Sequence, residues 1–586
     1  MKQIFLYGGL PLLAMVSLTG CIDDNYDLSD IDTTSEFKVK DLVLPINIDV
    51  VTLGDIIDIK EGDQIKEITI NGETFYAVRE SGSFASDPIS IPAFTTDAPA
   101  IQPSAINFNT GSTRKAPNRV SENSLTLSMQ DPIRRSVVYS AYNIDNSIMA
   151  IDDIFADLSI ALTFEADPSV TNLADISLEN LYLDLPKGLT ITNIFPEGNY
   201  NEGRLVIPRL YLEEGIAKVV LEASAINLPD NNCAIDYSSH SMQLQADVNI
   251  ESADLVMAPK SYAAVELPQS VTLNVNYSIS CLAANAVSGK IRYMLEGDAM
   301  NISPISLSDI PDFLAQDGTD LILANPQIYL SVNNPVANEN LGYQTGLCLT
   351  AHRNNEAPKE FTLDNGYFEV GYNKNVDGPY NFCLSPQAPE NVPDGYANPQ
   401  HVAFTSLSNV ISGNGIPASI GIELVEPQVY EQNVIHFELG RNLNALEGNW
   451  EFIAPLAMKS GSDSKIIYTE TKNGWNDDDV DAITISTLEL LMTVSSTLPL
   501  SAHLSGYPID INGNQISGVT IEGAEIPANA QDTPLTIRIT GEVKHLDGIT
   551  FTATVKPDSD KALSPSQTLT LKNIRAKVTG NYIKEL

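Results

Sequence analysis

Apolar and polar residues alternate with a period of two along much of this chain. The pattern is clear over residues 242–250, 271–275 and 549–555, and turns rich in Gly, Pro and Asn separate the alternating runs. Successive side chains of a β-strand point to opposite faces of a sheet, so this period predicts half-buried strands. Helical periodicity is scarce. The pattern therefore predicts an all-β protein of tandem antiparallel β-sandwich domains rather than βαβ units.

One hairpin is marked by its turn. Asn71-Gly72 separates the alternating segment Ile68-Thr69-Ile70 from residues 73–78. A two-residue type I′ turn requires positive φ at both central residues, and Asn-Gly meets that requirement at low cost. We expect residues 68–78 to form a β-hairpin.

The length of 586 residues predicts several domains, because a single core rarely grows beyond 250–300 residues. Residues 95–123 are rich in Pro, Thr, Ser and Asn and lack hydrophobic periodicity, which is typical of a linker. The expected order along the chain is a signal peptide (1–20), an acidic tether (21–35), a small N-terminal β domain (36–94), the linker (95–123), two β-sandwich regions (124–298 and 299–480) and a C-terminal β-sandwich (481–586).

The charge of the chain excludes one class of partner. Thirty-three basic residues stand against 75 acidic ones, which gives a formal charge of −42. A polyanion of this size repels phosphate backbones, so nucleic acid is not an expected partner. The hydrophobic content of 43% is sufficient for folded cores.

The N-terminal residues have the features of a targeting signal. Lys2 is followed by an apolar stretch over residues 4–16, which is too short for a membrane-spanning helix but suits a signal peptide. Leu18-Thr19-Gly20-Cys21 then resembles the bacterial lipobox. This resemblance implies that Cys21 is lipidated, becomes the first mature residue, and anchors the protein to the outer membrane.

Two further short motifs follow Cys21. Asp23 and Asp24, in Ile22-Asp23-Asp24-Asn25, resemble the acidic export signal that sends some Gram-negative lipoproteins to the outer face of the outer membrane. The alternative is a solvated acidic tether, which is compatible with export. Asp32-Thr33-Thr34 resembles an O-glycosylation site of the same kind of bacteria, so Thr33 is a candidate for a glycan.

Four cysteines remain after Cys21. Cys233, Cys281, Cys348 and Cys383 are even in number and belong to an oxidising compartment, and sequence order favours pairing the first two and the last two. Domains of this size do not need disulfides, so four buried free thiols are the alternative.

Motifs of catalysis are absent from the sequence: it contains no Gly-x-Ser-x-Gly, phosphate-binding loop or His-Glu-x-x-His. One cluster, Trp475, Asn476, Asp477 and Asp479, combines an aromatic ring with amides and carboxylates. This inventory suits a sugar contact. The acids could instead ligate Ca²⁺, although Ala482 and Leu488 depart from an EF-hand loop, or the cluster could be a solvated turn.

In outline the chain resembles the surface lipoproteins with tandem immunoglobulin-like domains that occur in bacterial glycan-uptake systems and among surface adhesins. The resemblance implies a non-enzymatic surface protein that acts in binding, adhesion or assembly with a surface protein partner. The alternatives are a glycan-binding accessory of polysaccharide import and a hydrolase with an unrecognised carboxylate site. No cofactor is expected beyond the candidate Ca²⁺.

Overall fold

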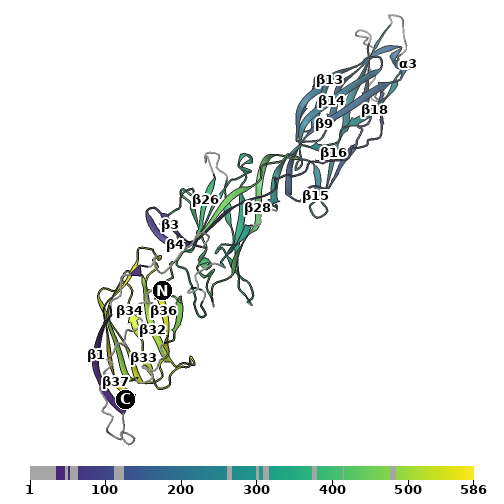
Figure 1. The fold of residues 1–586 in the computed structure, drawn as a ribbon. Helices are drawn as coiled ribbons and strands as arrows, with labels where there is room; N and C mark the ends of the chain where they lie inside the picture. Colours follow the sequence, from purple (N-terminus) through teal and green to yellow (C-terminus); the bar gives the residue numbers. More distant parts are fainter. Residues whose placement is uncertain are drawn as a thin grey trace, which may run out of the picture.

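The computed structural model describes residues 34–46, 51–52, 64–110, 124–260, 267–297, 302–307, 314, 316–354, 356–371, 379–413, 415–474 and 483–585. Antiparallel strands dominate these residues (Figure 1). The described helical structure consists of α3 (Pro168–Thr171) and short 3₁₀ turns such as Ala337–Glu339 and Thr405–Asn409. The expected all-β, antiparallel sandwich fold is confirmed.

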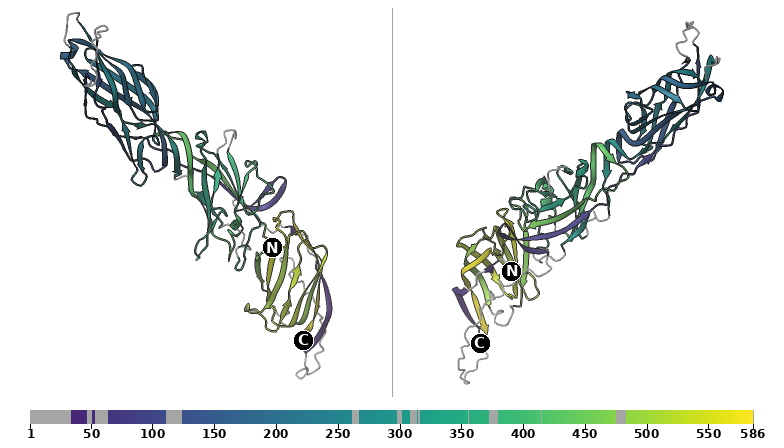
Figure 2. Two further views of the ribbon diagram at one scale, coloured as in Figure 1. Left: turned by 180° about the vertical axis from the view of Figure 1, so that it is seen from behind. Right: turned by 90° about the horizontal axis from the view of Figure 1, so that it is seen from above.

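The strands form three modules that follow one another along an elongated rod (Figures 1 and 2). The C-terminal module contains β1 (Thr34–Ile46), β2 (Val51–Thr52), β30 (Ile466–Lys472), β31 (Ile483–Ser496), β32 (Leu500–Ile509), β33 (Thr520–Glu522), β34 (Ala524–Ile526), β35 (Thr533–Val543), β36 (Gly548–Pro557) and β37 (Thr568–Glu585). The middle module contains β3 (Ile65–Ile70), β4 (Glu73–Ala85), β20 (Ala286–Met294), β21 (Ile302–Ser306), β22 (Gln327–Val332), β23 (Tyr343–His352), β24 (Lys359–Thr362), β25 (Phe368–Val370), β26 (Tyr380–Ser385), β27 (Gln400–Ala403), β28 (Ser419–Glu438) and β29 (Glu447–Pro455). The distal module contains α3 with β5 (Phe94–Thr95), β6 (Ser104–Asn109), β7 (Leu125–Met129), β8 (Ser136–Tyr142), β9 (Ile148–Ala166), β10 (Ala174–Asp184), β11 (Leu189–Phe195), β12 (Asn199–Asn201), β13 (Arg204–Leu212), β14 (Ile216–Asn227), β15 (Asn232–Asp236), β16 (Ser241–Asp247), β17 (Asn249–Pro259), β18 (Ser270–Ile279) and β19 (Ala283–Ala284).

The chain runs out along the rod and returns. It contributes β1 and β2 to the C-terminal module and β3 and β4 to the middle module, builds the distal module, and then completes the other two in reverse order. The first and last described strands are consequently neighbours, since Thr34 of β1 lies opposite Glu585 of β37. The C-terminal and middle modules therefore each contain strands from both halves of the chain.

Paired sheets enclose the cores. In the C-terminal module the sheet β1-β37-β31-β35-β33 packs on β30-β36-β32-β34, and buried Val494 of β31 and Ala524 of β34 belong to one core cluster. In the middle module the rings of Phe368 and Phe382 meet across the two sheets, with centroids 4.8 Å apart. Burial of such apolar faces drives sandwich formation. One strand pair, β26 with β27, is parallel.

The distal and middle modules share one continuous sheet. β20 pairs with β9 of the distal module on one side and with β28 of the middle module on the other. We call this three-stranded contact the waist. Because β20 is paired along its length with a strand of each module, the waist joins the two modules as a sheet rather than as a linker.

Local sequence patterns correspond to the observed strands. β18 buries Val271, Leu273 and Val275, and the stretch 242–250 alternates as expected within β16 and β17. The turn at Asn71-Gly72 has φ values of 51° and 85°, and it joins β3 to β4 as the predicted hairpin. The strand expected over residues 549–555 is observed as β36, but Thr550 within it is buried. Its hydroxyl is hydrogen-bonded there to the hydroxyl of Thr471 of β30, at 2.9 Å.

The expected domain boundaries are wrong where partners are distant in sequence. Residues 36–94 form no separate domain: β1 pairs with β37, and β4 pairs with β29. The expected linker 95–123 contains β6, which pairs with β18 inside the distal module. The expected start of the C-terminal domain after residue 480 is also too far along the chain, because β30 (residues 466–472) already pairs with β36 of the C-terminal module. Composition describes local segments, whereas these modules are defined by long-range pairing.

Candidate functional site

Most of the site residues expected from the sequence lie outside the described part of the chain. These are the lipidation residue Cys21, the export residues Asp23 and Asp24, the glycosylation candidate Thr33, and the cluster Trp475, Asn476, Asp477 and Asp479. They stay predictions. The described neighbour Gly474 donates its backbone N–H to Asp547 Oδ2 at 3.2 Å, which attaches the residue to the C-terminal module.

Cys233, Cys281, Cys348 and Cys383 are free thiols, so neither candidate disulfide is formed and the alternative of free thiols is confirmed, although Cys233 and Cys281 are only half-buried. Cys348 and Cys383 are buried on β23 and β26, which belong to different sheets of the middle module. Burial raises the pKa of the Cys233 thiol to about 11 and also raises the pKa values of Cys348 and Cys383. A raised pKa keeps a thiol protonated and unreactive, so Cys233, Cys348 and Cys383 are suited to packing rather than to nucleophilic chemistry.

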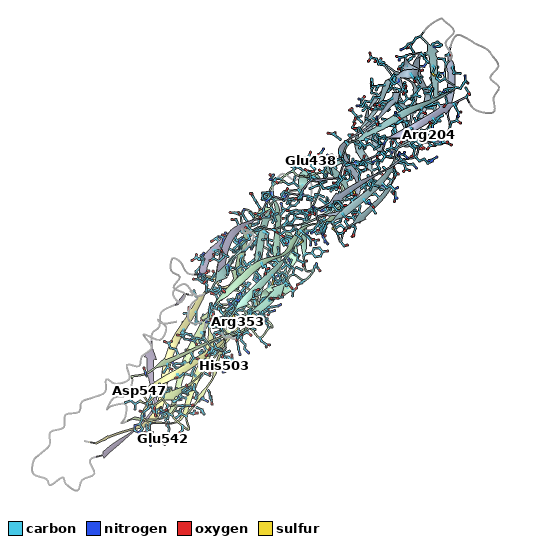
Figure 3. All side chains as sticks on the ribbon, turned by 90° about the vertical axis from the view of Figure 1, so that its right-hand side faces the viewer. Arg204, Arg353, Glu438, His503, Glu542 and Asp547 are labelled. Atoms are coloured by element: carbon cyan, nitrogen blue, oxygen red, sulfur yellow. The ribbon has the colours of Figure 1, made fainter. Side chains whose placement is uncertain are left out.

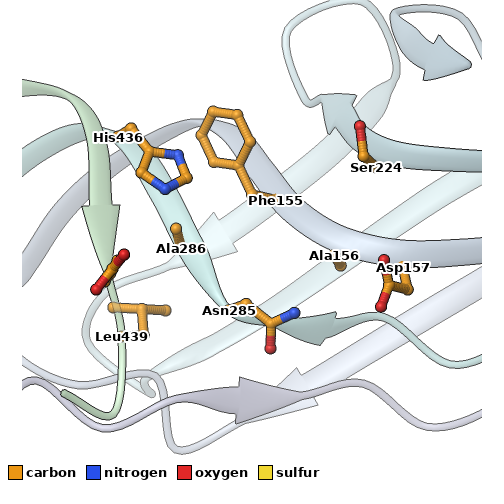
Figure 4. Close-up of a pocket in the computed structure, with 9 residues that line it drawn as sticks. Phe155, Ala156, Asp157, Ser224, Asn285, Ala286, His436 and Leu439 are labelled. Atoms are coloured by element: carbon orange, nitrogen blue, oxygen red, sulfur yellow. The ribbon is translucent and has the colours of Figure 1, made fainter. Parts of the chain in front are cut away.

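A shallow hollow of about 270 Å³ lies at the waist (Figure 4). We call it the waist hollow. It is lined by Phe155, Ala156, Asp157, Ser224, Asn285, Ala286, His436, Glu438 and Leu439. Glu438 marks its level along the rod in Figure 3, between Arg204 of the distal module and Arg353 of the middle module. The lining comes from β9, β14, the start of β20 and the end of β28, segments nearly 300 residues apart in sequence.

The backbone of the waist hollow is held by hydrogen bonds between these strands. The N–H of Asn285 donates to the carbonyl of Phe155 at 2.9 Å, and the N–H of Leu439 donates to the carbonyl of Asn285 at 2.8 Å. β9 pairs with β20 up to Phe155 and takes β18 as its partner from Ile160 onward. The hollow therefore lies where β9 exchanges β20 for β18 as its neighbour, so that this edge of β9 has no paired strand, among those described, between Phe155 and Ile160.

Bulges on two strands direct side chains into the waist hollow. On β9 the register against β14 shifts between Leu158 and Phe155, so that Ala156 and Asp157 oppose the single residue Ser224. On β28 the register against β20 shifts likewise, and both Ile435 and His436 oppose Ser288. A bulge interrupts the alternation of a strand and redirects its side chains, which is why bulges are common beside functional sites.

Rings and polar groups together line the waist hollow. The rings of Phe155 and His436 meet edge to face, with centroids 4.5 Å apart and planes at 68° (Figure 4). Asp157, Glu438, Asn285 and Ser224 also line the hollow and contribute two carboxylates, an amide and a hydroxyl. The set offers both hydrogen-bond donors and acceptors next to an aromatic face. Such a surface can bind a small polar ligand that also has an apolar side.

The neighbouring side chains brace the waist hollow. The backbone N–H of Asp153 donates to Ser288 Oγ at 2.9 Å, and the amide of Asn227 donates to Asp153 Oδ1 at 2.8 Å. These hydrogen bonds connect β9, β20 and β14 at Asp153, two residues before the lining residue Phe155. At the opposite side, Glu438 forms an ion pair of 2.9 Å with Arg441.

Sequence reasoning did not identify this site. Phe155 and Asp157 belong to an ordinary alternating strand, and His436 is an isolated histidine. The one local signal is Ile435-His436, where two outward residues interrupt the alternation of β28. The convergence of four strands that are distant in sequence has no local signature.

Among the described residues, no group of three or more His, Cys, Asp or Glu side chains is placed to hold a metal ion. Nor do the described residues contain a helix long and apolar enough to cross a membrane.

No family model matches the chain, and no curated protein matches it. Among solved structures, a protein from Parabacteroides distasonis that is predicted to be secreted aligns over 50% of this chain and 88% of its own length, with 15% identity and a TM-score of 0.34. A triple jelly-roll turret structure from an archaeal virus aligns with 9% identity and a TM-score of 0.11. At these scores neither similarity supports an argument about fold or function.

Proposed function

We propose that this protein is a non-enzymatic, lipid-anchored outer-membrane protein that acts as a stalk in binding, adhesion or assembly at the cell surface. The observation that carries the proposal is the position of β1. Thr34 lies opposite Glu585 at the free end of the C-terminal module, at the far end of the rod from the distal module (Figure 1). An anchor at Cys21 would thus attach the rod by one end and hold the distal module away from the membrane.

The connection between anchor and rod is short. Residues 22–33 separate Cys21 from Thr34, and an extended chain of that length spans at most about 40 Å. Their acidic composition favours an extended, solvated tether. The sheet that continues through the waist would then keep the distal module extended, which suits a protein that presents a surface to partners outside the cell.

The anchor is tested by Cys21→Ala. We expect an unprocessed or soluble precursor, because the Cys21 thiol is the acceptor of the lipid. Cys233→Ala is the matched control and should leave the protein in the outer-membrane fraction. Unchanged acylation and membrane localisation of Cys21→Ala would overturn the anchor.

The orientation is tested by an epitope tag inserted after Glu214, in the exposed turn between β13 and β14 of the distal module. Antibody should stain this tag on intact cells. Replacing Asp23 and Asp24 by Ala should abolish the staining but keep the lipid, whereas replacing Asp30 and Asp32 by Ala should not. Staining that requires permeabilised cells in the parent protein would refute surface display.

A further inference from the structure

The waist hollow has the features of a ligand site rather than of an accidental gap between modules. Two bulges, at Ala156-Asp157 of β9 and at Ile435-His436 of β28, lie on either side of the level at which Ala286 of β20 faces Phe155 and Glu438. β20 lies between these two strands, and its Gly289, which faces Val434 beside the β28 bulge, has a φ of 135°. Concentrated departures from regular strand geometry require support from the surrounding structure and cluster at functional sites.

An exposed apolar side chain precedes the lining residue His436 in β28. Ile435, the other bulge residue of β28, is 89% exposed, the highest value among the exposed large hydrophobic side chains of the described residues. It lies next to His436 on the solvent side of the strand, while Val434 and Phe437 are buried. The aromatic pair and Ile435 therefore offer apolar area to a ligand, between polar groups that fix its orientation.

The charge of the waist hollow selects the ligand. Its lining contains two carboxylates, Asp157 and Glu438, and neither Lys nor Arg. Glu438 forms an ion pair with Arg441, which also lies 3.8 Å from Glu339. A phosphate, sulfate or uronate would meet like charge, which is unfavourable at short range. Hydroxyl groups, by contrast, can donate to carboxylates and accept from an amide.

The size sets a further limit. A volume of about 270 Å³ lies just below the range of about 300–1,000 Å³ typical of pockets for drug-sized ligands. It suits a single ring with its substituents, and the open side of the hollow allows that ring to be one unit of a longer chain.

From these observations we infer that the waist hollow binds a neutral saccharide, with one sugar ring against Phe155 and His436 and its hydroxyls on Asp157, Glu438 and Asn285. This assignment deepens the binding role proposed above and names its ligand class. A C–H face of the sugar would pack on the rings, while the carboxylates accept hydrogen bonds from hydroxyls.

The test uses the full chain, purified in detergent, with the methyl glycosides of glucose, galactose, mannose and N-acetylglucosamine as probes and methyl glucuronide as the acidic match. We expect at least one neutral glycoside to bind with a Kd of about 1 mM or tighter by calorimetry or saturation-transfer NMR, and the glucuronide to bind more weakly. Asp157→Ala and His436→Ala should each weaken binding by about tenfold, since each removes one ligand contact.

Both variants change exposed side chains, so their thermal unfolding should match that of the parent. Asp247→Ala, at an exposed carboxylate elsewhere in the distal module, is the matched control and should bind like the parent. The assignment is refuted if no neutral glycoside binds, if both variants bind like the parent, or if the glucuronide binds more tightly. Surface display is measured on cells and does not depend on this result, so failure of either proposal can be recognised separately.

Discussion

Gly289 is the residue on which the geometry of the waist most depends. It lies in β20 between bulged pairings with β9 and β28, and its φ is 135°, a value that residues with a Cβ rarely adopt. A Cβ at this position would lie 2.2 Å from the carbonyl oxygen of Ala150 and 3.0 Å from the Cα of Ile151. Both contacts are with backbone, so no side-chain rotation can relieve them. We predict that Gly289→Ala destabilises the waist.

The loss of stability expected for Gly289→Ala is the sum of two free-energy costs. A sparsely populated backbone conformation costs about 1–3 kcal/mol, and an overpacked contact that forces a backbone shift costs a further ~1–3 kcal/mol. The sum is about 2–6 kcal/mol. For a folding unit of roughly 150–250 residues, each kcal/mol lowers Tm by about 2–4 °C, so a central value of about 4 kcal/mol corresponds to about 8–16 °C.

Two glycines of the middle module separate these costs. Gly366 has a φ of 78° and no atom within 4 Å of an added Cβ, so Gly366→Ala should show the conformational cost alone, about 1–2 kcal/mol. Gly371 also has open space around it and lacks a positive φ, so Gly371→Ala should change stability by less than about 0.5 kcal/mol.

Scanning calorimetry of the full chain gives the Tm values, and hydrogen exchange shows where protection is lost. For Gly289→Ala we expect faster exchange in β20 and in the part of β9 paired with it. If Gly289→Ala is no less stable than Gly366→Ala, the contact with Ala150 is relieved cheaply and our reasoning about the waist is wrong.

Three further predictions concern groups outside the waist hollow. Alkylation under non-reducing, denaturing conditions should modify Cys233, Cys281, Cys348 and Cys383, whereas in the folded protein Cys383 should stay unmodified; fewer than four modified thiols among these after denaturation would show a disulfide. Hydrogen bonds from the hydroxyls and backbone N–H groups of two following serines lower the pKa of Asp236 to about 2, so the stability it contributes should be present above its ordinary value near 3.8 and be lost as pH falls through about 2; NMR titration with an unshifted midpoint would contradict this. Arg79→Ala leaves the carboxylate of Glu451, which is only 7% exposed, without its ion-pair partner and should cost about 3–5 kcal/mol. Glu451→Ala leaves the half-exposed Arg79 to be rehydrated and should cost less, about 1–3 kcal/mol, so the reverse order of Tm values would refute the argument.

The sequence by itself determined the class of secondary structure and several local features. Alternation over 271–275 predicts the half-buried strand β18, and Asn71-Gly72 predicts the β3–β4 hairpin, because side-chain period and positive φ are properties of a few consecutive residues. The resemblance of residues 18–21 to a lipobox is likewise a local signal, which is why a prediction of the anchor needs no tertiary structure.

Only the tertiary structure decided how the modules are composed and where a site lies. The pairing of β1 with β37 and of β4 with β29 joins segments several hundred residues apart, and the entropy of closing such loops grows only slowly with their length. The composition of a segment therefore does not reveal whether its partner strand lies close by or several hundred residues away in the sequence. The waist hollow depends on the same long-range pairing: Phe155 and His436 become neighbours only because β20 pairs with both of their strands. Each is an ordinary strand residue in its own segment, and their shared chemistry exists only in the folded sheet.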